Sequence, residues 1–238
     1  MKLKKISTLC LAASTFFAAS SAMAWESEDG AFSTSASVAG ASDYVWRGYS
    51  QTDEQIAVQG SFDVSHSSGL YAGTWASNVD FDDDASSEID VYAGFSSEFN
   101  DTGIGYDVGI LRYIYPGENY GWNEGYGSLS YSLFNVGVAY SGSVYDTSET
   151  GVYYSAGFDY DLPYDVALNA GVGYYDYDSK VYGKGNPDSA TDYHIGVSRD
   201  FFGFGFDLTY YDTDSDAEDL YSDDLADSRV VFTISKSM

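Results

Sequence analysis

The chain has 238 residues, and its ten Lys and Arg residues stand against 37 Asp and Glu residues, for a formal net charge of -27. This balance argues against nucleic acid as a partner and against docking on an anionic membrane surface, because both need clustered basic residues. Aromatic residues make up 18% of the chain, which excludes a disordered acidic chain and favours one folded domain.

The first 24 residues have the pattern of a cleaved secretory signal peptide. Three lysines among the first five residues precede an apolar stretch over 6–20, and Ala22-Met23-Ala24 follows as an A-x-A cleavage site. The apolar stretch is too short for a transmembrane helix. Cleavage after Ala24 would leave residues 25–238 as a single domain without cysteine, which excludes a fold held together by disulfides.

Period-two alternation of apolar and polar residues predicts twelve strands in the rest of the chain. In one of them, Phe204, Phe206 and Leu208 alternate with glycine and aspartate. Most candidates have the length that a tilted strand needs to cross a bilayer. They are 31–42, 55–65, 70–80, 87–97, 103–114, 124–132, 135–145, 152–160, 164–175, 191–199, 204–212 and 228–236.

The connections between these candidates alternate in length. Short turns follow the even-numbered candidates, and mostly longer polar loops follow the odd-numbered ones. A soluble β-sandwich, the alternative fold, gives no reason for this alternation, whereas an outer-membrane barrel has short periplasmic turns at one rim and long external loops at the other. The predicted fold class is therefore all-β, an antiparallel up-and-down transmembrane barrel of about 12 strands in the cell outer membrane. The longer loops are 43–54, 81–86, 115–123, 146–151, 176–190 and 213–227.

Lipid offers no hydrogen-bond partners, so a closed barrel must turn its apolar tracks outward and its Gly, Ser, Asp and Asn tracks inward. Three cations fall on outward tracks near strand ends, where long side chains can reach the headgroups: Arg112, Arg199 and Lys236. Tyrosines near strand ends are expected to form an interfacial girdle: Tyr113, Tyr115, Tyr174, Tyr175, Tyr210 and Tyr211.

The segment 42–52, Ser-Asp-Tyr-Val-Trp-Arg-Gly-Tyr-Ser-Gln-Thr, begins a pattern that continues in 57–60, 68–81, 88–95 and 115–117. These motifs resemble the TorF family of Gram-negative outer-membrane porins. The resemblance covers about residues 31–117. It implies an outer-membrane location and a porin-like barrel, and it does not specify a substrate.

The predicted function is a passive diffusion channel for small solutes with a preference for cations, and no catalytic activity, metal or cofactor is expected. Four inward carboxylates lie two to four residues from short turns and could form a partial acidic ring near the periplasmic mouth. Alternatively, they are solvated lumen residues without a role in selectivity. The four are Asp63, Asp107, Asp159 and Asp207.

Arg47 is the one cation in the motif-rich first external loop, where three aromatic residues flank it. It could fold inward as a constriction of the channel or stack on its aromatic neighbours. It could equally be an ordinary loop arginine that pairs with Asp43 or Asp53.

The external loops are dense in aspartate, which favours either a solvated loop or loose binding of divalent cations that bridge it to lipid phosphates. Asp212-x-Asp214-x-Asp216 is similar to the start of a calcium loop. Ala217 and Asp223 stand where an EF-hand has Gly and Glu, which argues against that motif.

Two other function classes stay open. A non-conducting structural or adhesive barrel is one, because inward side chains or a folded loop can plug twelve strands. A barrel enzyme is the other; His66 and His194 are the only histidines, and Ser189, Asp192 and His194 could be drawn as a catalytic set. Expected partners are outer-membrane lipid and lipopolysaccharide, the barrel-assembly machinery and small solutes, with no nucleic acid.

Overall fold

The computed structural model describes residues 25–238, so the predicted signal peptide lies outside the described residues. Twelve antiparallel strands follow one another around a barrel, and pairing of the last strand with the first closes it. This confirms the predicted fold class. The barrel strands are β2 (Phe32–Ala41), β5 (Ala57–His66), β6 (Leu70–Asn78), β7 (Ser87–Glu98), β8 (Ile104–Ile114), β9 (Asn123–Tyr131), β10 (Phe134–Ser141), β11 (Gly151–Leu162), β12 (Val166–Tyr177), β13 (Ser189–Phe201), β14 (Phe204–Thr213) and β15 (Arg229–Ser237).

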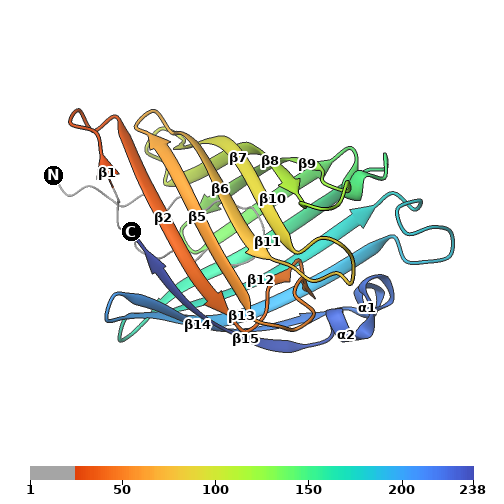
Figure 1. The fold of residues 1–238 in the computed structure, drawn as a ribbon. Coiled ribbons are helices and arrows are strands. Elements are labelled where there is room, and N and C mark those ends of the chain that lie inside the picture. The colour runs from red at the N-terminus through yellow and green to blue at the C-terminus, as the bar shows by residue number, and fades with distance from the viewer. Residues whose placement is uncertain (1–24) are drawn as a thin grey trace.

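The barrel has one end with short turns and one with long loops (Figure 1). We call them the turn end and the loop end. Both Trp25 and Met238 belong to the turn end, where strand β1 (Trp25–Glu26) pairs with β2. Helices α1 (Ser215–Tyr221) and α2 (Asp223–Ala226) lie at the loop end. Among the described residues, no helix is long and apolar enough to cross a membrane.

Three connections differ from the sequence predictions. The segments 43–54 and 213–227, predicted as loops, contain a small β-hairpin and the helices α1 and α2. The strand predicted over 135–145 ends at Ser141, and the chain turns through the 3-10 helix Val144–Asp146. Tyr145 and Asp146 adopt positive φ angles, outside the strand region, so the strand cannot extend to residue 145 as predicted.

The apolar tracks face outward, as predicted. Ile110, Val136 and Phe232 are 67%, 49% and 45% exposed, whereas inward residues on the same strands are largely covered. Arg112 and Arg199 also point outward near strand ends, and Lys236 donates to the carbonyl of Gly203 over 2.6 Å. The outer surface therefore has the apolar band and the flanking cations that a membrane-spanning barrel requires.

The predicted tyrosine girdle is right for two of its six residues and wrong for four. Tyr174 and Tyr210 are exposed on the outer face, but their chain neighbours Tyr175 and Tyr211 are buried inside the barrel. Tyr113 and Tyr115 are buried there as well. Successive side chains in a strand point to opposite faces, so adjacent tyrosines cannot both reach the lipid.

Inward tyrosines lie across neighbouring strands at positions where those strands carry glycine. The Tyr71 hydroxyl crosses over Gly94 and donates to Asp107 over 2.6 Å. Tyr126 lies over Gly109 in the same way. A Cβ added at Gly94 would collide with the Tyr71 hydroxyl and would lie 2.7 Å from the carbonyl oxygen of Val108. Glycine here makes room for a flat aromatic lining.

We expect Gly94→Ala to destabilise the barrel by about 1–3 kcal/mol, because the backbone carbonyl cannot move aside without disturbing the ladder. Gly40→Ala is the matched control, since a Cβ added at Gly40 has nothing within 4 Å. Urea unfolding of the protein in lipid vesicles measures both variants. Equal stability of the two would contradict the packing role of Gly94.

Candidate functional site: the lumen and its hairpin

The four predicted lumen carboxylates face inward and follow a regular spacing. They lie on β5, β8, β11 and β14, the second, fifth, eighth and eleventh of the twelve barrel strands. Each lies three residues from the turn end of its strand. The barrel therefore carries one acidic side chain every quarter turn at similar height: Asp63, Asp107, Asp159 and Asp207.

These carboxylates have neutral donors as partners. Tyr92 donates to Asp63 over 2.5 Å, Tyr71 to Asp107 over 2.6 Å, Asn135 to Asp159 over 3.2 Å and Thr209 to Asp207 over 2.8 Å. None of the ion pairs among residues 25–238 includes any of the four. No cation of the described chain is therefore placed to cancel their charge.

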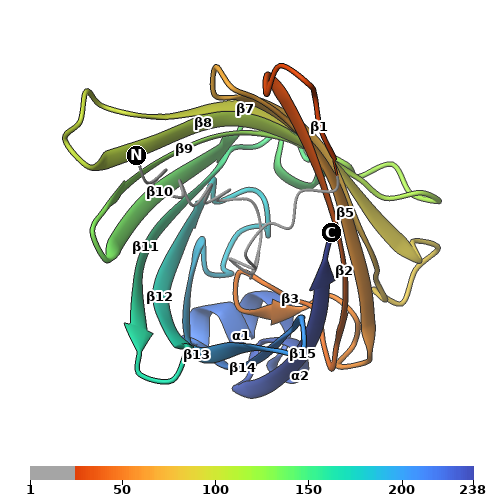
Figure 2. The ribbon, with the colours of Figure 1, turned by 90° about the vertical axis from the view of Figure 1, so that its left-hand side faces the viewer.

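The first long loop folds into the barrel and does not project from it. Strand β3 (Val45–Trp46) pairs with β4 (Tyr49–Ser50) through the two-residue turn Arg47-Gly48, and Figure 2 shows β3 inside the ring of strands. We call Val45–Ser50 the lumen hairpin. Both turn residues have positive φ, 47° and 92°, the geometry of a type I′ turn.

The tip of the lumen hairpin touches the barrel wall at β13 and β14. A Cβ added at Gly48 would lie 2.6 Å from side-chain carbons of Asp192 on β13 and Thr213 on β14. A left-handed conformation on a non-glycine residue such as Arg47 is uncommon and persists only where the surroundings hold it. The contacts of Arg47 provide that support.

Arg47 is buried and clamped to Glu124 on β9. Its two terminal nitrogens donate to the two carboxylate oxygens over 2.9 and 2.7 Å, a bidentate pair. The guanidinium lies over the rings of Trp46, Tyr153 and Tyr175, at 4.3, 4.2 and 4.7 Å from their centroids. Desolvation is the largest influence and opposes the charge, but Glu124 together with the Tyr175 and Tyr113 hydroxyls outweighs it, so the pKa of Arg47 is raised well above its usual value.

The hypothesis that Arg47 pairs with Asp43 or Asp53 is wrong. Asp43 instead holds the base of the hairpin, where it accepts hydrogen bonds from Ser50 and Thr52 over 2.7 and 2.8 Å. It also pairs with Arg229 on β15 at 3.0 Å. The lumen hairpin instead carries Arg47 to β9, where Glu124 accepts hydrogen bonds from both of its terminal nitrogens.

Aromatic rings fill the space between the lumen hairpin and the wall. Trp46 is 2% exposed and makes edge contacts with surrounding rings at centroid distances of 5.6–6.1 Å. Tyr44 donates to Glu88 on β7 over 3.0 Å. Edge-to-face packing adds to the area that such rings bury. The rings around Trp46 are Tyr49, Tyr113, Trp122 and Tyr175.

A chain of tyrosine hydroxyls connects the hairpin to helix α1. Tyr49 stacks on Tyr221 with centroids 4.0 Å apart, and its hydroxyl lies 3.2 Å from that of Tyr145. The Tyr177 hydroxyl lies 3.2 Å from the hydroxyl of Tyr145 and 2.5 Å from that of Tyr221. Burial raises the pKa of Tyr49, Tyr145 and Tyr221, so these hydroxyls stay protonated. Helix α1 begins at an aspartate cap: Asp214 accepts from the amide of Ala217 over 3.0 Å.

Comparison with known proteins assigns the chain to a family. The model of a family described as "Bacterial protein of unknown function (Gcw_chp)" matches residues 26–238. The chain belongs to the Gcw_chp family. That match does not carry the TorF name, which stays a resemblance of the motifs. No curated protein matches this Gcw_chp chain.

Solved structures show what the Gcw_chp fold is similar to. The KdgM porin is 11% identical, with 86% of this chain and 99% of that chain covered and a TM-score of 0.55. The KdgM porin in complex with disordered oligogalacturonate is 10% identical over the same shares of the two chains, with a TM-score of 0.57. At 10–11% sequence identity, this structural similarity shows that the two proteins share a barrel fold.

Sequence reasoning missed two carboxylates in the loop-end half of the Gcw_chp barrel and gave a third another role. Glu88, Glu124 and Asp192 are buried inward-facing residues that hold the hairpin or the tyrosines next to it. Alternation assigns all three residues to the inside, but Asp192 was considered only as a member of a catalytic set. Glu88 and Glu124 were overlooked because their partners include residues of a loop whose path alternation does not predict.

The structure does not assemble the catalytic set. Asp192 accepts hydrogen bonds from Tyr153 over 2.9 and 3.2 Å, and the His194 ring lies over Gly171. Ser189 lies opposite Asp176 in the strand register. Within residues 25–238, no hydrogen bond joins Asp192, His194 and Ser189. His66 is at the turn end, where its ring nitrogen lies 2.8 Å from the Ser68 hydroxyl.

Proposed function

We propose that this Gcw_chp protein is an outer-membrane porin that lets small cationic or neutral solutes diffuse passively through its lumen. The observation that carries the proposal is a closed barrel, apolar outside, with four inward carboxylates that form no ion pair among the described residues. Its fold is similar to that of the KdgM porin. The turn end would then face the periplasm and the loop end the exterior.

The cation preference rests on where the charges lie. Three basic residues are on the outer face, two are in the long loop between β12 and β13, and Arg229 is paired at the loop end. Arg47 faces the lumen, but Glu124 neutralises it. A ring of carboxylates attracts cations, whereas anionic sugars such as the oligogalacturonate bound by the KdgM porin would meet repulsion.

In this proposal the lumen hairpin is the constriction. It narrows the external half, while the four aspartates, small residues and inward tyrosines such as Tyr71 and Tyr92 line the periplasmic half. Arg47 acts here as a clamp that positions the hairpin, since its charge is already paired. The selectivity falls to the four aspartates on the other side of the constriction.

Single-channel recording under a KCl gradient tests the preference. We expect the wild-type reversal potential to lie on the cation side, and the double variant Asp107→Asn/Asp207→Asn to move it toward zero, because half of the ring loses its charge. Asp80→Asn, in an exposed loop, is the matched control and should leave the potential unchanged. A wild-type potential on the anion side would overturn the role of the acidic ring.

A further inference from the structure

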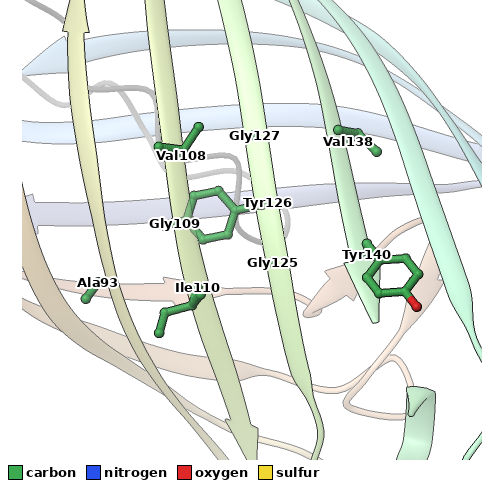
Figure 3. A pocket seen from close by; sticks show the side chains of 9 residues that line it. All are labelled: Ala93, Val108, Gly109, Ile110, Gly125, Tyr126, Gly127, Val138 and Tyr140. Atoms are coloured by element: carbon green, nitrogen blue, oxygen red, sulfur yellow. The ribbon is translucent and has the colours of Figure 1, made fainter. Parts of the chain in front are cut away.

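A groove runs along the outer face of the barrel where the outward positions of β9 are glycines. Gly125 and Gly127 form its floor, and a Cβ added at Gly125 would meet nothing within 4 Å. Apolar side chains of β8 and β10 form its two walls (Figure 3). The groove has a volume of about 430 Å³. The wall residues are Val108, Ile110, Val138 and Tyr140.

Arg112 lies at the external end of one wall. It follows Ile110 by two residues on the same face of β8, a rise of about 7 Å along the strand. Its neighbour in the register is Asn123 on β9, which follows the same outward track as the two floor glycines. A positive charge and an amide therefore stand directly above an apolar groove.

This cation has no carboxylate partner in the described part of a strongly acidic chain. Arg47, Lys180 and Arg229 each pair with acidic side chains. Arg112 and Arg199, the two outward arginines near opposite rims, take part in no ion pair among residues 25–238. On the outer face of a membrane barrel, the anion available at headgroup level is a lipid phosphate.

We propose that this groove and Arg112 form a binding site for one phosphorylated, multi-acylated glycolipid of the outer leaflet, lipopolysaccharide. An acyl chain lies over Gly125 and Gly127 between the two apolar walls, and a phosphate pairs with the guanidinium of Arg112. The site rests on the membrane orientation given under Proposed function, but not on conduction through the lumen. It goes beyond the channel itself by naming a lipid that the barrel holds.

Native mass spectrometry of the mature protein in detergent, titrated with lipid A, tests the site. We expect a one-to-one adduct with the wild type, and a loss of affinity of about tenfold in Arg112→Gln and in Gly125→Leu, which remove the charge and fill the groove. Arg199→Gln and Gly40→Leu are matched controls at the other rim and at an outward glycine beside open space. Their affinity for lipid A should lie within about twofold of that of the wild type.

Several outcomes would overturn the proposal. One is unchanged binding in both Arg112→Gln and Gly125→Leu, and another is an equal loss in Arg199→Gln. Binding of phosphatidylglycerol with the same affinity as lipid A would show that the site is not specific for a glycolipid. A dimer that disappears in Gly125→Leu would assign the groove to a second copy of the chain. Arg112→Gln leaves the backbone untouched and keeps the test decisive if Gly125→Leu does not fold. Conductance recorded on the same variants separates failure of the lipid site from failure of the channel.

Discussion

Replacing residues 44–51 with a short Gly-Ser linker is expected to raise single-channel conductance several-fold while the barrel stays folded. The barrel does not need the lumen hairpin for closure, because β2 pairs with β5 over the full length of both strands. Removing the hairpin takes Trp46, Arg47 and their neighbours out of the external half of the lumen. Water then enters and solvates Glu88 and Glu124, so their loss of partners carries little cost.

The matched control replaces 183–187, in the long loop between β12 and β13, with the same linker. This segment lies outside the lumen hairpin, so the conductance should equal that of the wild type. Heat-modifiable migration in SDS gels verifies that both variants are folded. Equal conductance of the hairpin variant and the wild type would show that the hairpin is not the constriction.

Arg47→Ala is expected to release the lumen hairpin from the wall in a large fraction of molecules. Truncating one partner leaves the Glu124 carboxylate buried and unpaired, which costs about 3–5 kcal/mol. Exit of the hairpin relieves that cost by letting water reach Glu124. Hydrogen exchange should therefore rise over residues 45–50, while the strand amides keep their protection.

The double variant Arg47→Leu/Glu124→Leu separates charge from packing. Removing both charges leaves no unpaired ion, so the hairpin should stay protected far better than in Arg47→Ala. Arg47→Lys keeps the charge but loses the two-pronged geometry, and its exchange should fall between the two. If the amides of residues 45–50 in Arg47→Ala exchange as slowly as in the wild type, Arg47 does not hold the hairpin in place.

The strands and their facing could be predicted because both follow from a local rule. Successive side chains in a strand point to opposite faces, so every second residue faces the lumen. Alternation therefore assigned Asp107 and Asp207 to the lumen and Val108 and Leu208 to the outside. The same rule shows why the tyrosine girdle was wrong. Tyr174 and Tyr175 were assigned together from their place along the chain, although parity puts one outside and one inside.

The path of the first loop could not be predicted in the same way. Its conformation depends on a bond between Arg47 and Glu124, which are 77 residues apart, and on rings contributed by several strands. No local pattern encodes such a contact. The sequence signals that did exist were the adjacent Arg-Gly of a tight turn and the aromatic residues around it.

The most direct measurement is single-channel recording of refolded residues 25–238 and of the hairpin-replaced variant in the same planar bilayer under a KCl gradient. The account predicts discrete steps from both proteins, with larger steps from the variant and a reversal potential on the cation side for each. Folded hairpin-replaced protein that gives no steps at all would contradict the channel and favour a plugged structural barrel.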